Sequence, residues 1–200
     1  MIYFTADQHF GHKKIIEYAN RPFSSVQEMD QALVDYWNAA VLRDTDQVYV
    51  LGDFTLGGFR QAAKYFAQLR GRIFVIPGSH DQNWLQSSRF DQMALRSVGG
   101  QLVTVLSPLF TLEVSDYRLG DYDLPIVLSH YAMRVWDRSH YGSVHLYGYS
   151  HGQLAGSGRS FDVGVDAVGF APISLDEVMT RIWIIDNYIA NTFPTILRRF

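Results

Sequence analysis

The sequence has 200 residues, a net charge of −3 and no cysteine. Without cysteine, disulfide bonds and thiolate metal sites are excluded, so any bound metal must be held by nitrogen and oxygen atoms. The slightly negative charge, without any run of like charges, excludes the broad basic surface that grips long nucleic acids. The length suffices for one domain with its own core, and the sequence predicts a single domain over residues 1–200.

Strand-like and helix-like segments alternate through the first half of the chain. The predicted strands, which are short apolar runs, are 2–6, 47–51 and 72–76. The predicted helices are 12–20, 25–42, 59–69 and a segment near 90–98. The helix over 25–42 opens with Ser25-Val26-Gln27-Glu28, which is a capping-box pattern.

Strands dominate the second half, where turn residues leave little room for helices. The predicted strands are 101–105, 109–114, 126–129, 145–149, 161–165 and 181–185, and one helix is predicted to begin at Ser174. Together the two halves predict an α/β fold of the mixed α+β kind. We expect a four-layer α-β-β-α sandwich, in which two packed mixed sheets are flanked by helices.

The sequence also bears on location. No apolar run reaches the length that a bilayer span requires, and the first residues lack the pattern of a signal peptide. We therefore expect a cytoplasmic protein with no membrane partner.

Aspartate and histidine follow five predicted strands at the point where each strand ends. In chain order they are Asp7 with His9, Asp53, His80 with Asp81, His130, and His151. Ligands of open α/β sheets collect beyond the carboxyl ends of the strands, and these residue types bind divalent transition metals. In an extended chain, Asp7 and His9 point the same way, so one ion could contact both.

Each stretch taken alone also has a purely structural explanation. Gly52-Asp53 is common in turns, and Asp81 could cap a helix. A single histidine such as His130 is more often a structural residue than a ligand, and Asp7 with His9 could form an ordinary loop. The shared position at successive strand ends favours a joint metal site over a set of unrelated turns.

In this order, the residues resemble the motifs of the calcineurin-like metallophosphoesterase superfamily, which are D-x-H, G-D, G-N-H-D/E, a single H and G-H-x-H. The matching stretches are Asp7-Gln8-His9, Gly52-Asp53, Gly78-Ser79-His80-Asp81, His130 and Gly148-Tyr149-Ser150-His151. The phrases FTADQHFGH, VYVLGDF and LSHYAMRVW are similar to a small bacterial or phage branch of the superfamily. The resemblance extends from the first strand to about residue 152, and it identifies residues 1–200 as one metallophosphoesterase domain.

The resemblance implies one or two divalent transition-metal ions per chain, with Mn, Fe, Zn, Ni or Co compatible with the ligands. The implied ligands of the first ion are Asp7, His9, Asp53 and His151. The second ion would share Asp53 and take His130, with Ser79 and Tyr149 at its remaining ligand positions. The implied catalytic residues are His80, as proton donor or charge stabiliser, and Asp81, which would orient His80.

Two positions depart from the family pattern, and both belong to the second ion. Ser79 stands where the family has Asn, and Tyr149 stands where it has His. A serine hydroxyl is shorter than an asparagine carbonyl, and a phenol with an ordinary pKa of ~10 ionises at a cost. The second site could be weak or empty, rebuilt around another metal, or changed by engineering. A weakened or remodelled second site is our hypothesis.

The implied activity is hydrolysis of a phosphoester by a metal-bound hydroxide, with a phosphodiester favoured over a monoester. The expected partner is a small phosphorylated substrate rather than long nucleic acid, and an oligomer is compatible with the sequence. Two alternatives stay open. One is a catalytically impaired family member that binds a metal or a phosphorylated ligand without efficient turnover, and the other is a nuclease.

Overall fold

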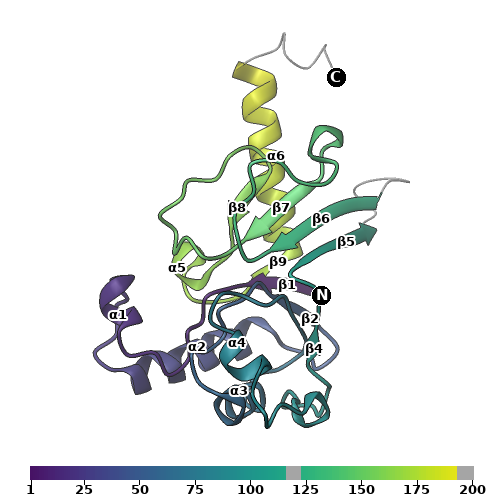
Figure 1. Ribbon diagram of the computed structural model, residues 1–200. Coiled ribbons are helices and arrows are strands. Elements are labelled where there is room, and N and C mark those ends of the chain that lie inside the picture. The colour runs from purple at the N-terminus through teal and green to yellow at the C-terminus, as the bar shows by residue number, and fades with distance from the viewer. Residues whose placement is uncertain (116–122, 193–200) are drawn as a thin grey trace.

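Two mixed β-sheets pack together in the computed structural model, which describes residues 1–115 and 123–192 (Figure 1). The first sheet has the strand order β4-β3-β2-β1-β9, and β1 to β4 are parallel while β9 is antiparallel to β1. Its strands are β1 (Ile2–Thr5), β2 (Gln47–Val50), β3 (Arg72–Val75), β4 (Thr104–Val105) and β9 (Ile173–Ser174).

The second sheet has the order β5-β6-β7-β8, with β5 and β6 antiparallel and the other pairs parallel. Its strands are β5 (Leu109–Ser115), β6 (Asp123–Ser129), β7 (Val144–Tyr147) and β8 (Ser160–Asp162). The helices are α1 (Ile15–Tyr18), α2 (Val26–Ala40), α3 (Phe59–Phe66), α4 (Gln82–Leu85), α5 (Val165–Val168) and α6 (Leu175–Thr192). The predicted mixed fold of two packed sheets with flanking helices is confirmed.

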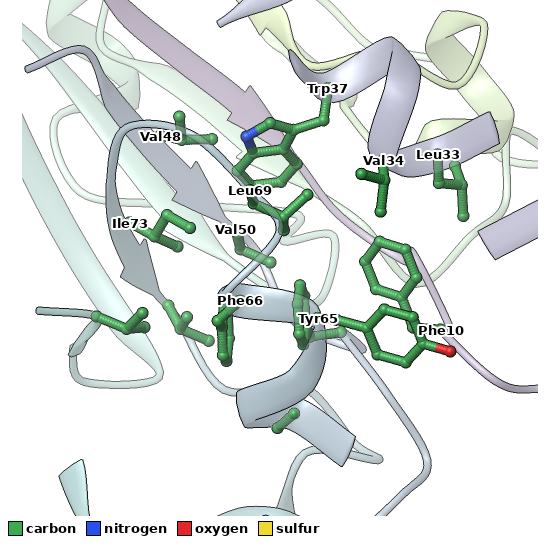
Figure 2. Close-up of a cluster of buried hydrophobic side chains, with 14 of the residues drawn as sticks. Phe10, Leu33, Val34, Trp37, Val48, Val50, Tyr65, Phe66, Leu69 and Ile73 are labelled. Carbon is green, nitrogen blue, oxygen red and sulfur yellow. The ribbon is translucent and has the colours of Figure 1, made fainter. Parts of the chain in front are cut away.

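Alternation along the strands divides the core into two clusters. Successive side chains of a strand point to opposite faces, so Val48 and Val50 of β2 face the helices while Tyr49 and Leu51 face the second sheet. Figure 2 shows the helix side of this sheet, where side chains of α2 and α3 meet those of β2 and β3. The first sheet is therefore covered on both faces, which suits a mostly parallel sheet.

The start of α2 follows the predicted capping pattern. Ser25 is the N-cap, and its side chain accepts a hydrogen bond of 3.2 Å from the backbone N–H of Glu28. The Glu28 carboxylate, however, accepts from the backbone N–H of Ser24 at 2.8 Å. A fully reciprocal capping box begins α6, where Ser174 and Glu177 bond each other at 2.7 and 3.2 Å.

The predicted strand over 181–185 is wrong, because α6 continues through it. Leu175, Val178 and Ile182 recur at helical spacing, and all three are buried against both sheets. The period of this apolar pattern outweighs the β-prone character of residues 182–185. No helix among the described residues is long and apolar enough to span a membrane.

The predicted helix near residues 90–98 is also wrong. A single 3-10 turn at Gln92–Ala94 replaces it, and Asp91 caps that turn. The chain then doubles back, with Arg96 bridging to Leu102 in an antiparallel pair. Gly99 and Gly100 lie at this reversal, and Gly100 adopts a positive φ of 73° that few other residues take without strain. The reversal leaves β4 shorter than the predicted strand over 101–105.

The predicted strand over 161–165 ends early. β8 stops at Asp162, and Val165 already begins α5. The remaining predicted helices and strands are present, although α1 is limited to one turn.

Candidate metal centre

The carboxyl ends of both sheets meet at one place in the fold. Beyond β1 and β2, backbone bonds of 3.0 Å join Asp7 to Gly52 and His9 to Asp53. The end of β1 also reaches the second sheet, because Ala6 forms a parallel bridge with Gly164 and accepts a 3.0 Å bond from Val165. Turns that follow β1, β2, β3, β6 and β7 are thereby brought together, as the sequence predicted.

Several site residues have a left-handed backbone, which is rare outside glycine. They are Asp7 (φ 61°), His9 (φ 53°), Asp53 (φ 54°), Tyr149 (φ 68°) and His151 (φ 49°). Each such conformation costs about 1–2 kcal/mol for an L-residue, so surrounding contacts must hold it. Strained residues of this kind cluster at functional sites.

Glycines allow the turns to approach closely. At Gly52, with φ of 91°, an added Cβ would lie 2.6 Å from Nδ1 of His130. At Gly148, an added Cβ would lie 2.7 Å from Oδ2 of Asp7. Side chains at these two positions would occupy space that the aspartate and histidine groups need.

Two groups of residues, all buried except the partly exposed His151, bring possible coordinating atoms within 4.8 Å of one another. One group is Asp7, His9 and His151, and the other is Asp7, Asp53 and His130. Asp53 also faces both sides, because its oxygens lie 3.7 Å from Nε2 of His9 and 3.4 Å from Nε2 of His130. These groups could hold a metal ion, and they contain all the predicted Asp and His ligands.

Several coordinating atoms in these groups are buried without a hydrogen-bond partner. They are Oδ1 of Asp7, both ring nitrogens of His9 and Nε2 of His130. An unsatisfied buried polar atom costs about 1–3 kcal/mol, and four in one place are unusual. A bound cation would satisfy Oδ1 of Asp7, one ring nitrogen of His9 and Nε2 of His130, so the residues present fit a metal ion.

The other polar atoms of Asp7 and His130, which would not bind the ion, have hydrogen-bond partners within the protein. Oδ2 of Asp7 accepts a 2.8 Å bond from the backbone N–H of Tyr149, and Nδ1 of His130 lies 2.7 Å from the carbonyl of Leu51. The Nδ1 atom of His151 lies 2.6 Å from Asp166. Partners of this kind fix the orientation and the tautomer of metal-binding histidines.

Burial and neighbouring charges shift the pKa values of the side chains at the centre. Burial raises the pKa of Asp7 to about 7, although the charges of His130 and His151 oppose this shift. Burial also opposes ionisation of Asp53, but contact with His130, the backbone N–H of His80 and the charge of His9 lower the pKa of Asp53 overall. Burial lowers the pKa of His9, so its ring is neutral and available for coordination.

Arg21 and Asp166 bind the residues of the centre through hydrogen bonds. The sequence analysis assigned neither residue a role. The Arg21 side chain is fully buried and forms two 2.8 Å bonds with the Asp166 carboxylate. It also donates to the backbone carbonyls of Asp7 at 2.7 Å and Gln8 at 2.9 Å. One arginine thus ties the turn after β1 to the carboxylate that orients His151. The position of Asp166, just beyond a predicted strand, was a signal for this role.

Asp81 has different partners from those predicted. Its oxygens accept bonds of 2.8–3.0 Å from the backbone N–H groups of Asp53, Phe54 and Gly78, and one of 2.8 Å from the Trp84 indole. The side chain is fully buried. Asp81 is therefore a positioning residue that holds the turn bearing Asp53, and its predicted role of orienting His80 stays a prediction.

The two unusual residues lie at the expected side of the centre. The Ser79 hydroxyl donates to both Asp53 oxygens, at 3.2 and 3.1 Å. The Tyr149 ring is 54 % exposed and stands edge-on to the rings of His130 and Tyr131, at centroid distances of 5.5 and 4.9 Å. Both residues lie next to the Asp53–His130 pair where the second ion was predicted.

His80 lines the cavity beside the centre. Its ring is half-exposed, its Nε2 lies 3.8 Å from Asp53, and its backbone N–H donates to Asp53 at 2.8 Å. The cavity has a volume of about 790 Å³ and is also lined by His9, Asp53 and His151. A ligand in this cavity can therefore contact the metal-binding groups and His80 at once.

Metal affinity is expected to fall as the pH is lowered from about 8 to about 6, because protons compete for the same groups. Burial raises the pKa of Asp7 to about 7. Burial would lower the pKa of His130 and of His151, but contacts with Asp53 and Asp166 raise them overall. Calorimetric titration with Mn²⁺ in two buffers of different ionisation enthalpy measures the affinity and the protons released. An affinity that is constant over this pH range would contradict the expectation.

No family model matches the chain. The uncharacterized protein MJ1445 of Methanocaldococcus jannaschii is 30% identical to it over 183 residues, which cover 90% of each protein. The chain belongs to the family of this archaeal protein. The family similarity extends to the gene 66 protein of Mycobacterium phage L5, which is 27% identical over 195 residues that cover 88% of this chain and 91% of the phage protein.

A solved structure shares the fold of this family member. The crystal structure of the protein of unknown function AQ665 from Aquifex aeolicus superposes with a TM-score of 0.64 at 19% identity. The match covers 91% of this chain and 99% of that chain. At this identity the similarity supports the fold alone, so the activity must be argued from the site.

Proposed function

We propose that the protein is a metal-dependent phosphoesterase of the calcineurin-like metallophosphoesterase superfamily, with a small phosphodiester as its substrate. The observation that carries the proposal is the set of unpartnered coordinating atoms on buried Asp7, His9 and His130. The order of the motifs along the chain, at the ends of parallel strands, agrees with it. The proposed ions are Mn, Fe, Zn, Ni or Co, which accept nitrogen and oxygen ligands.

The chain's own residues supply the binding and the positioning. Bound divalent ions provide an activated water nucleophile and relieve charge on the phosphoryl oxygens. Asp7, His9 and His151 would hold one ion, and His130 would hold a second, with Asp53 between them. The proposed enzyme therefore needs no nucleophilic side chain.

His80 is the proposed proton donor to the leaving oxygen. Its ring is 45% exposed at the cavity and lies 5.5 Å from the ring of His9, so it can reach a phosphoryl group held at the centre. The bond from its backbone N–H to Asp53 fixes the residue against a carboxylate that would hold the ions. A protonated imidazole there would assist departure of the alcohol and balance charge in the transition state.

The proposal is tested by elemental analysis of the purified protein and by hydrolysis of bis-p-nitrophenyl phosphate during a titration with Mn²⁺. We expect one or two transition-metal ions per chain and a rate that rises with Mn²⁺. Removal of the metal by a chelator should abolish hydrolysis, and Mn²⁺ should restore it. A protein that contains no metal and binds none would sink the proposal.

The alternative is a family member that binds a metal or a phosphorylated ligand without efficient turnover. The hydrogen bonds from Ser79 to Asp53 favour it, because they occupy oxygens that a second ion would need. Stoichiometric Mn²⁺ binding without hydrolysis of either a phosphodiester or a phosphomonoester would favour this alternative.

The double substitution Ser79→Asn and Tyr149→His is expected to strengthen binding of a second Mn²⁺ ion by about 10-fold or more. Loss of a residue that only orients a ligand weakens metal affinity by roughly 10–100-fold, and a residue that binds the metal directly should matter more. The change would restore a carbonyl and an imidazole beside Asp53 and His130. Calorimetry gives the stoichiometry, and the rate of bis-p-nitrophenyl phosphate hydrolysis should rise with it. The matched control is Tyr141→His, at a tyrosine that is 81% exposed. Unaltered stoichiometry and rate in the double variant would defeat the idea of a weakened second site.

A further inference from the structure

The cavity beside the metal centre has an apolar wall in addition to its polar one. Tyr18 of α1, Leu56 of the turn after β2 and Leu154 of the segment after His151 contribute this wall. Tyr18 is 66% exposed and Leu154 is 50% exposed. Exposed apolar side chains that gather in one cavity, next to convergent polar groups, mark a ligand-binding site.

The apolar wall is continuous with the metal centre through His12. The His12 ring lies 5.5 Å from the ring of His9 and 6.3 Å from the ring of Tyr18. A ligand held by its phosphoryl group at the centre would therefore extend along His12 towards Tyr18.

The charge of the lining limits what that ligand can be. Among the described residues that line the cavity there is no lysine and no arginine. Within this lining, a polyphosphate or a long nucleic-acid backbone would find cationic partners only at the metal centre, and such ligands depend on several phosphate contacts; Lys14, whose charge acts on His12, lies outside the lining. The lining instead suits one phosphoryl group attached to an uncharged apolar group.

We propose that the wall of Tyr18, Leu56 and Leu154 binds an uncharged aromatic ring carried by the phosphoester. The substrate class is thus an aryl or nucleobase-bearing phosphoester with a single phosphoryl group at the centre. This inference rests on the proposed function. Tyr18 and Leu154 are specificity-determining residues in it, because rings stack on tyrosine and pack against leucine.

The test compares two non-hydrolysable probes, phenylphosphonate and methylphosphonate, on the Mn²⁺-loaded full chain by calorimetry. Phenylphosphonate should bind about 10-fold more tightly, as expected when one ring is buried at an apolar wall. Tyr18→Ala and Leu154→Ala should each reduce this ratio by about 3-fold or more, with Mn²⁺ affinity unchanged. The control is Tyr36→Ala, at a tyrosine on α2 that is 46% exposed and lies outside the cavity lining.

The outcomes separate this inference from the proposed function. Equal affinities for the two probes, with intact Mn²⁺ binding and hydrolysis, would overturn the aromatic wall alone. Binding of oligonucleotides that strengthens with their length would also overturn it. Failure of Mn²⁺ to bind, or of bis-p-nitrophenyl phosphate to be hydrolysed, would remove the proposed function and this inference with it. Tyr18 and Leu154 are exposed, so their variants should keep the unfolding midpoint of the unaltered protein.

Discussion

Asp53→Asn is expected to weaken Mn²⁺ binding by more than about 100-fold, which is the upper end for loss of an outer-shell partner. Phosphodiester hydrolysis should fall at least as far. The Asp53 carboxylate lies 3.7 Å from Nε2 of His9 and 3.4 Å from Nε2 of His130, so it faces one proposed ligand of each ion. Asparagine has nearly the same shape but neither the charge nor the second oxygen that a bridging ligand needs. Calorimetric Mn²⁺ titration and initial rates measure the two losses.

The matched control is Asp35→Asn on α2. The Asp35 carboxylate accepts a hydrogen bond from Gln31 at the protein surface. The control substitution therefore makes the same chemical change away from the centre. The control should keep full Mn²⁺ affinity and rate. If Asp53→Asn also kept both, Asp53 would have no bridging role and the proposed arrangement would be wrong.

Arg21→Met is expected to lower the free energy of unfolding by about 3–5 kcal/mol, the usual cost of removing one partner of a buried ion pair. The Asp166 side chain is only 5% exposed, so methionine would leave its charge buried without the guanidinium. The carbonyls of Asp7 and Gln8 would lose their donor as well. Urea-induced unfolding, followed by circular dichroism, measures the change.

Two further variants separate charge from geometry. Arg21→Lys keeps the charge but cannot form the two parallel bonds, so an intermediate loss is expected. Arg138→Met removes an exposed arginine that pairs with Glu113, and it should cost less than about 1 kcal/mol. A loss at Arg21→Met no larger than that at Arg138→Met would show that the buried pair does not stabilise the fold.

The pair should also make stability depend on pH. Burial would raise the pKa of Asp166, but its bonds to His151 and Arg21 lower it overall. A lowered carboxyl pKa gives stability that is present above the unfolded-state value of about 3.9 and is lost as the pH falls through the folded-state value. The unaltered protein should therefore lose more stability in acid than Arg21→Met does.

The sequence predicted the gathering of the site because the evidence for it is local. A short apolar run that ends in Asp or His can be recognised from neighbouring residues alone, and parallel pairing then brings the ends together. Asp7, His9, Asp53, His130 and His151 were found in this way, and the structure groups them as possible metal ligands.

Other features depend on contacts between distant residues. Arg21 and Asp166 are separated by 145 positions, so neither could be paired with the other from its neighbourhood. The role of Asp81 depends on where its four donors lie in space, and a motif does not contain that information. The strand predicted over 181–185 failed because the burial of Val178 and Ile182 on one helix face decides the structure there.

The β-bridge between Ala6 and Gly164 joins the two sheets at the edge where the aspartates and histidines lie. If this contact between the sheets opened, the proposed metal-binding atoms of the two sheets would move apart. An ion that binds only the closed arrangement would therefore stabilise the contact. The supply of the proposed ion would then govern the lifetime of the protein. Depletion of the proposed ion should make this contact between the sheets accessible to proteases before the helices on the opposite face of the first sheet unfold.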